Sequence, residues 1–134
     1  MIDFANEIYD TFAKGVKAQH KDCKTSGEYI RTPSAFPAAT LDEIKNVSVD
    51  RLEDSSNEEK FAEVGYRLQV FSNKQKGKKA EARAIFATAD SLLRGMGLKR
   101  KTFTTTPEFY NSTIYSITAT YEGTISADGV VYGK

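Results

Sequence analysis

The residues best suited to covalent chemistry are Cys23 and His20, the one cysteine and the one histidine of the chain. A cysteine–histidine nucleophile also needs a group that orients the imidazole and donors that stabilise an oxyanion. The sequence around the pair supplies neither, and a thiol flanked by Lys21, Asp22 and Lys24 is expected at the surface. The pair therefore predicts no catalytic site. A single cysteine also excludes an intrachain disulfide, which is typical of a reducing compartment.

Motifs for phosphate, metal or nucleophile chemistry are absent from the sequence. It contains no GxxxxGK[ST], GxGxxG, HExxH, CxxC or GxSxG. One histidine and one cysteine cannot supply the three or four nitrogen and sulfur ligands of an ordinary transition-metal site. Asp42 and Glu43 are adjacent, so a strand would place them on opposite faces, and Asp50 and Asp54 lack the spacing of a calcium loop. We therefore predict no enzyme activity, no cofactor and no metal; carboxylates that converge only in the fold remain the alternative.

Two stretches concentrate charge, although the formal net charge is only +1. Residues 47–60 (VSVDRLEDSSNEEK) are acidic, and residues 72–79 (SNKQKGKK) are basic through Lys74, Lys76, Lys78 and Lys79. The plain interpretation of the acidic stretch is a solvated loop or the tips of two long paired strands, and that of the basic stretch is a solvated turn. The alternatives are an acidic loop that meets a basic surface of a neighbouring subunit, and a lysine cluster that binds phosphate. Nucleic-acid binding needs many cations, and a nearly neutral chain gives it little support.

The length of 134 residues and a hydrophobic content of 40% indicate a single domain that covers residues 1–134. Such a chain can bury a sufficient core without a disulfide or a metal. The acidic, amphipathic start does not resemble a signal peptide. The apolar runs are far shorter than the roughly 20 residues that span a bilayer. We therefore expect a chain that is made and folded in the cytosol, with no membrane partner.

Apolar residues at three- and four-residue spacing predict two helices, over residues 2–19 and 78–94. Gly95 and Gly97 offer left-handed positions at which the second helix ends. Strands are predicted over residues 38–46, 61–71, 98–106, 111–126 and 130–132, with a hairpin turn at Asp128-Gly129. Pro33 and Pro37 predict a loop over residues 32–37, after an extended segment over 28–31.

Two of the strands show the period-two alternation of a sheet with one face on the core. In residues 61–71 the core face is Ala62, Val64, Tyr66, Leu68 and Val70, and in the later strand it is Tyr115, Ile117, Ala119 and Tyr121. The fold class is therefore α+β: a two-layer sandwich of a mainly antiparallel sheet with both helices packed on one face. The opposite sheet face is expected to be uncovered in the monomer. Its mixed composition is compatible with a solvated sheet, and it also suits contact with another subunit, where arginine and aromatic residues are enriched. The predicted contact residues are Phe61, Glu63, Arg67, Gln69, Phe71, Lys76, Lys78, Lys79, Thr118 and Thr120.

Residues 70–85 (VFSNKQKGKKAEARAI) resemble a strand–turn–helix passage of small phage tail proteins. In that passage a strand ends in aromatic-Ser-Asn, a turn of lysine and glycine follows, and an alanine-rich helix begins. Residues 34–38 (SAFPA) and 58–66 fit the same pattern. So does the ending, in which a strand with Tyr115 and Tyr121 leads into the hairpin at Asp128-Gly129. The resemblance covers roughly residues 2–132 and is one of layout and local sequence, with no catalytic signature.

The family is that of siphophage tail terminators, also called tail-completion or minor capsid proteins. The resemblance implies a homohexameric ring on the head-proximal end of the tail tube, within the virion. The ring would stop tube polymerisation and dock the head–tail connector, so the partners are the tube protein, the connector protein and further copies of the chain. DNA would pass through the lumen without sequence-specific binding. The candidate lumen-lining residues are the polar positions of the open face, and the alternative is that they are ordinary solvent-facing residues: Glu63, Arg67, Gln69, Thr118 and Thr120. Head–tail joining proteins share the layout and are the alternative function. A small nucleic-acid-binding module is a further alternative.

Overall fold

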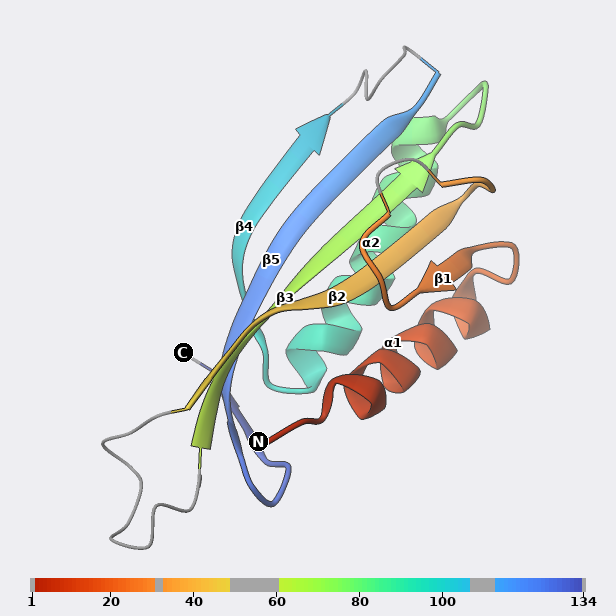
Figure 1. The fold of residues 1–134 in the computed structure, drawn as a ribbon. Helices are drawn as coiled ribbons and strands as arrows, with labels where there is room; N and C mark the ends of the chain where they lie inside the picture. The colour runs from red at the N-terminus through yellow and green to blue at the C-terminus, as the bar shows by residue number, and fades with distance from the viewer. Residues whose placement is uncertain (1, 31–32, 49–60, 107–112, 134) are drawn as a thin grey trace, which may run out of the picture.

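The computed structural model describes residues 2–30, 33–48, 61–106 and 113–133. Two helices lie side by side on one face of a twisted sheet (Figure 1). The fold is α+β, as predicted. In chain order the elements are α1 (Ala5–Gln19), β1 (Lys24–Ser26), β2 (Ala38–Ser48), β3 (Phe61–Ser72), α2 (Lys78–Gly95), β4 (Lys99–Thr106), β5 (Tyr115–Ser126) and β6 (Val131–Gly133).

The strand order in the sheet is β1-β2-β3-β5-β4, and β6 pairs with the end of β5. All 12 residues of β3 have a partner on β5, from Phe61 opposite Ser126 to Ser72 opposite Tyr115. This long antiparallel pair forms the centre of the sheet. The short strand β1 was not predicted, and it runs parallel to β2. The described sheet therefore ends in a three-residue strand on one side and in the eight-residue β4 on the other.

The two helices approach each other closely because Gly15 on α1 has no side chain. A Cβ atom at Gly15 would lie 2.5 Å from the side chain of Leu92 on α2. The helix α1 begins three residues later than the sequence predicts. The reason is a tertiary contact: the side-chain amide of Asn46 donates to the backbone oxygen of Ile2 at 2.8 Å, and Ile2 is itself buried.

The helix α2 has the extent that the sequence predicts to within one residue. It follows Gly77, whose φ of 88° lies in the left-handed region, and the chain leaves the helix through Gly97 with φ 99°. Gly95 is still helical, so only one of the two predicted stop glycines acts as one. At Gly97 a Cβ atom would lie 2.8 Å from the backbone oxygen of Val131, which makes glycine necessary there for two reasons.

The main core lies between the helices and one sheet face. The predicted inward residues of β3 and β5 are all buried in it, which confirms the alternation. From the helices it receives Ile8, Phe12, Val16, Ala82, Ile85, Phe86, Ala89 and Leu93. The layer that contains the helices is therefore the one in which most of the apolar surface is buried.

The opposite sheet face is partly covered, and the prediction of a bare face is wrong at one end. The chain between β1 and β2 passes over this face (Figure 1). There Phe36 packs against a second cluster of Ala38, Phe71 and Ile114. The segment predicted as extended, residues 28–31, is no strand where the structure describes it; the strand of this region is β1 instead. The loop prediction over 33–37 is confirmed.

The remaining strand predictions differ from the structure mainly at their ends. Val47 and Ser48 belong to β2 and pair with Glu63 and Ala62 of β3, so for these two residues the prediction of paired strand tips is confirmed and that of a loop is wrong; residues 49–60 lie outside the described residues. The strand predicted to begin at residue 111 begins at Tyr115 in the described part. The hairpin turn is confirmed, and Gly129 in that turn has φ 87°.

Candidate interaction surfaces

The sheet face opposite the helices consists of cross-strand rows, because the antiparallel register places side chains of neighbouring strands next to one another. One row contains Thr40, Gln69, Thr118 and Thr104, and the next contains Asp42, Arg67, Thr120 and Thr102. The Thr40 hydroxyl donates to Gln69 Oε1 at 3.2 Å. The hydroxyls of Thr102 and Thr120 are 2.7 Å apart. Hydroxyl groups and paired charges, rather than apolar side chains, thus make up these rows.

Arg67 stands at the middle of this face and is held by neighbours within the chain. Its Nε donates to Asp42 Oδ1 at 3.2 Å and its Nη2 to Asp42 Oδ2 at 2.7 Å, a two-pronged ion pair. The guanidinium also lies 4.3 Å from the ring centre of Tyr29. The charge of Arg67 is therefore balanced by Asp42 and shielded by the segment that crosses the face.

Lys45 occupies the next position along the face and lies between two carboxylates. Its Nζ is 3.3 Å from Glu63 and 4.0 Å from Glu122. Gly65 makes room for it, since a Cβ atom at Gly65 would lie 3.1 Å from the Cβ of Lys45. Further along β2, the side chain of Val47 is exposed. This end of the face therefore combines a lysine–glutamate cluster with an accessible apolar group.

The structure brings together only part of the predicted contact set. Phe61, Glu63, Arg67, Thr118 and Thr120 are partly exposed on β3 and β5. Phe71 is fully buried and Gln69 is 5% exposed, so their prediction as accessible contact residues is wrong. The physical reason is the segment between β1 and β2, whose Phe36 packs on the cluster that contains Phe71.

The predicted lysines lie in a different place from the sheet face. Lys76 and Lys79 are exposed, and Lys78, the first residue of α2, is partly buried. They surround the N-terminal end of α2, where the helix dipole is positive and lysine is unfavourable. Their positions are therefore not explained by helix stability, and Lys76 and Lys79 form an exposed basic turn at the positive end of the helix dipole.

The backbone N–H of Cys23 donates to the backbone oxygen of His20 at 3.0 Å, but the two side chains make separate contacts. Cys23 is buried, which corrects the expectation of a surface thiol, and its Sγ donates weakly to the backbone oxygen of Lys24 at 3.6 Å. Burial, and secondarily the negative charge of Glu81, raises the pKa of the Cys23 thiol to about 11. His20 Nε2 lies 2.9 Å from the Thr88 hydroxyl and so ties the end of α1 to α2. A neutral, buried thiol is a poor nucleophile.

Two pairs of a tyrosine and a carboxylate on the helix-covered side were not foreseen. Tyr66 and Tyr121 face each other across β3 and β5. The Tyr66 hydroxyl donates to Glu43 at 2.6 Å, and that of Tyr121 donates to Asp90 at 2.5 Å. Burial first, and then these hydrogen bonds, raise the pKa of both phenols well above the usual range. The sequence signal was a tyrosine at an inward position of each central strand, because a buried hydroxyl needs a partner.

A cleft of about 460 Å³ separates α2 from β4. Phe103 of β4 meets Phe86 of α2 edge to face, with ring centres 5.0 Å apart. Arg83 lies 5.6 Å from the ring centre of Phe103, and Arg100 lies 5.9 Å from that of Phe86. Below them Asp90 accepts from Arg100 at 3.0 Å. The sequence predicted both elements, but their side-by-side position depends on the sheet order.

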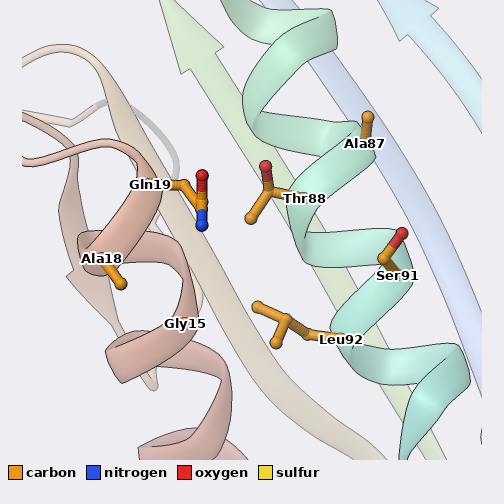
Figure 2. A pocket seen from close by; sticks show the side chains of 7 residues that line it. All are labelled: Gly15, Ala18, Gln19, Ala87, Thr88, Ser91 and Leu92. Atoms are coloured by element: carbon orange, nitrogen blue, oxygen red, sulfur yellow. The ribbon is translucent and has the colours of Figure 1, made fainter.

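A shallow groove of about 510 Å³ runs between the two helices on the outer surface (Figure 2). Leu92 points from α2 toward Gly15 of α1, and the rest of the lining is small or uncharged (Figure 2). The lining residues are Gly15, Ala18, Gln19, Ala87, Thr88, Ser91 and Leu92. Such a lining offers no acid, base or cation for catalysis.

Within the described ranges, no three side chains of histidine, cysteine, aspartate or glutamate gather as a metal site would require. Neither of the two described helices has the length and apolar character to cross a bilayer. Comparison with protein-family models and with curated protein sequences gives no match to this chain. Its function must therefore be argued from its surfaces.

Proposed function

We propose that this chain is a structural subunit of a long-tailed phage: a tail terminator that forms a ring on the head-proximal end of the tail tube. The ring stops tube polymerisation and presents a docking surface to the head–tail connector. The observation that carries the proposal is the sheet face opposite the helices, which is ordered, only partly covered and built of paired polar groups. The resemblance of residues 70–85 to phage tail proteins supports the same function.

The placement of charge along β3 favours head-to-tail contacts. The acidic residues 49–60 end where β3 begins at Phe61, and the basic turn follows where β3 ends at Ser72. An extended strand of this length spans roughly 36 Å. The two oppositely charged stretches are thus joined to opposite ends of the same strand. A closed ring needs two different patches on each subunit, and this pair provides them.

The polar rows also suit the lining of a lumen through which DNA passes. Asp42 neutralises Arg67, and two glutamates neutralise Lys45. Each unpaired cation that contacts a phosphate adds to DNA affinity by releasing counterions. Because each of these cations is paired and one negative charge is in excess, a lining of these residues and threonine hydroxyls lets DNA move without being held, as a tail conduit requires.

Imaging of tail tubes that assemble in the presence of the purified chain tests this proposal. We expect caps on one end of the tubes and a shorter, narrower length distribution. The charge-reversed variant Lys76→Glu/Lys78→Glu/Lys79→Glu should lose ring formation or capping. The matched control, Lys14→Glu/Lys17→Glu/Lys21→Glu, makes the same charge change along α1 and just after it and should cap like the wild type. Tubes of unchanged length with the wild-type chain would contradict the proposal.

The same experiment separates the alternatives. A chain that binds the purified connector but ignores tube ends is a head–tail joining protein. The exposed Lys76 and Lys79 at the start of α2 favour nucleic-acid binding as a second candidate. That function predicts DNA binding which weakens steeply with salt and disappears in the triple glutamate variant.

A further inference from the structure

The strand β4 is the last strand of the described sheet, and its outer edge has no neighbouring strand there. In an antiparallel pair, alternate residues turn their N–H and C=O groups toward the partner, so the others point outward. Seven of the eight residues of β4 are exposed. Such an edge can accept a further strand from another chain unless the sequence prevents it.

The two halves of β4 differ in how strongly their sequences oppose pairing with a strand of another chain. The first half is Lys99, Arg100 and Lys101, and the pairing with β5 is irregular between Arg100 and Thr102. Lysines and irregularities are the features by which proteins block edge pairing. The second half, Thr102–Thr106, contains only threonine and Phe103, which are good strand formers. It carries no charge and no proline, so this half remains open to a strand.

An apolar anchor lies beside the open half. Phe103 is 39% exposed and borders the cleft of about 460 Å³ between α2 and β4. Its ring packs edge to face against Phe86, and Arg83 lies beside it. Added strands gain affinity from main-chain hydrogen bonds and specificity from pockets for alternate side chains. The cleft supplies such a pocket next to the free edge.

The surroundings of this edge are basic. The cations of β4 and of the adjoining face of α2 are Arg83, Arg94, Lys99, Arg100 and Lys101. Of the carboxylates described there, Asp90 is only 13% exposed and already accepts from Tyr121 and Arg100, while Glu122 is the register partner of Lys99 on β5 and lies 4.0 Å from Lys45 Nζ. The same edge of a second copy would be repelled, whereas an acidic segment would be attracted.

We propose that β4 binds an extended acidic segment of a partner protein, which adds to the sheet as a further strand along Thr102–Thr106. The carboxylates of that segment lie near Lys99 and Lys101, and one large apolar side chain enters the cleft beside Phe103. This surface is separate from the lysine turn at the start of α2, so the inference stands independently of the ring.

Two synthetic peptides of the same composition test the proposal by isothermal titration calorimetry with the full chain. One is acetyl-Glu-Asp-Glu-Val-Phe-Val-Thr-Val-amide and the other has its acidic residues at the opposite end, so the pair covers both strand directions. We expect one of them to bind, with an affinity that falls about tenfold or more between 50 and 200 mM sodium chloride. Two further versions of the binding peptide carry N-methyl groups at alternate residues, one at the odd and one at the even positions. The version whose methyl groups lie on the edge that faces β4 should lose binding.

Charge variants of the chain complete the test. Lys99→Glu/Lys101→Glu should weaken binding about tenfold or more, and the control Lys14→Glu/Lys21→Glu should stay within about twofold of the wild type. Because these lysines are exposed, neither change should alter the fold, which circular dichroism verifies. The proposal is overturned if neither peptide binds at about 1 mM, since a specific added strand should bind more tightly. Binding that survives N-methylation in both frames overturns it too, because the peptide would then not pair with β4 through its backbone. The proposal is also overturned if the free chain is a dimer that Thr104→Lys abolishes, because β4 would then pair with a second copy.

Discussion

The two faces of the sheet place carboxylates of nearly equal burial in opposite roles. Asp90 on the helix-covered side is 13% exposed and Asp42 on the other side is 14% exposed. Asp90 accepts from a buried phenol and is also paired with Arg100 of β4 and Arg94 of α2, whereas Asp42 is bound in a two-pronged pair with Arg67. The covered face thus uses its polar groups to fix a dry core, and the opposite face uses them to present an ordered surface.

This difference indicates that the helix-covered face serves stability and that the opposite face serves contacts with partners. Alternate residues of one strand point to opposite faces, so β3 serves both purposes with Leu68 on one side and Arg67 on the other. Changes on the covered face should cost stability. Changes on the opposite face should leave the fold nearly intact and alter contacts with partners.

The largest expected effect is that of Leu68→Ala, on the covered face. Leu68 is fully buried, and truncating it leaves a cavity, which should lower the free energy of unfolding by about 2–5 kcal/mol. Urea unfolding followed by circular dichroism measures this change. A loss below about 1 kcal/mol would show that the site is not packed as described.

Removal of a buried phenol hydroxyl comes next. Tyr121→Phe takes a donor from Asp90 and should lower the free energy of unfolding by about 1.5–3 kcal/mol. Tyr66→Phe should act in the same direction through Glu43. The control is Tyr29→Phe, which keeps the ring over Arg67 and should be nearly neutral. Equal stability of Tyr121→Phe and the control would contradict the contrast between the faces.

Alkaline pH should test the burial and hydrogen bonding of the same phenols without mutation. The pKa of both phenols is raised in the folded chain, so they stay neutral while unfolded tyrosines ionise above about pH 10. Their contribution to stability is present below that pH and should fall by about 1.4 kcal/mol per pH unit for each phenol above it. The pKa of Cys23 is raised from 9.0 to about 11, so its thiol adds to this loss of stability from about pH 9 upward. Tyr121→Phe should show a shallower loss in urea titrations across this range.

The smallest effect is expected on the opposite face. Arg67→Gln removes the ion pair with Asp42, but both side chains reach solvent, so the loss should be about 1 kcal/mol or less and should shrink in high salt. Comparison of urea unfolding with and without about 1 M sodium chloride measures it. A loss of unfolding free energy as large as that of Leu68→Ala would contradict the assignment of the structural core to the helix-covered face.

The sequence predicted the parts of the fold that depend on local periodicity. The inward residues of β3 and β5 and the extent of α2 follow from spacing alone, because each pattern is repeated over ten or more residues. The position of Tyr29 over Arg67 could not be predicted, since it joins segments far apart in the chain through an irregular connection. The parallel pairing of β1 was missed for the same reason, as three residues are too few to show a period.

The candidate surfaces were predicted less completely than the fold. Alternation identified the residues on the opposite face but not their neighbours, so Phe71 was expected to be accessible although Phe36 packs beside it. The cleft beside Phe103 depends on β4 lying last in the sheet, next to α2. Strand order is a property of the assembled sheet, and no single segment encodes it.

The most direct test of the proposed function is lysine footprinting of the chain with and without assembled tail tubes. Lys14 and Lys17 on α1, and Lys76 and Lys79 beside the start of α2, are all exposed in the isolated subunit. Acetylation followed by mass spectrometry compares their reactivity in the two states. We predict that Lys76 and Lys79 become protected in the presence of tubes, while Lys14 and Lys17 react as before. Unchanged reactivity of Lys76 and Lys79, or protection of Lys14 and Lys17 instead, would contradict the account.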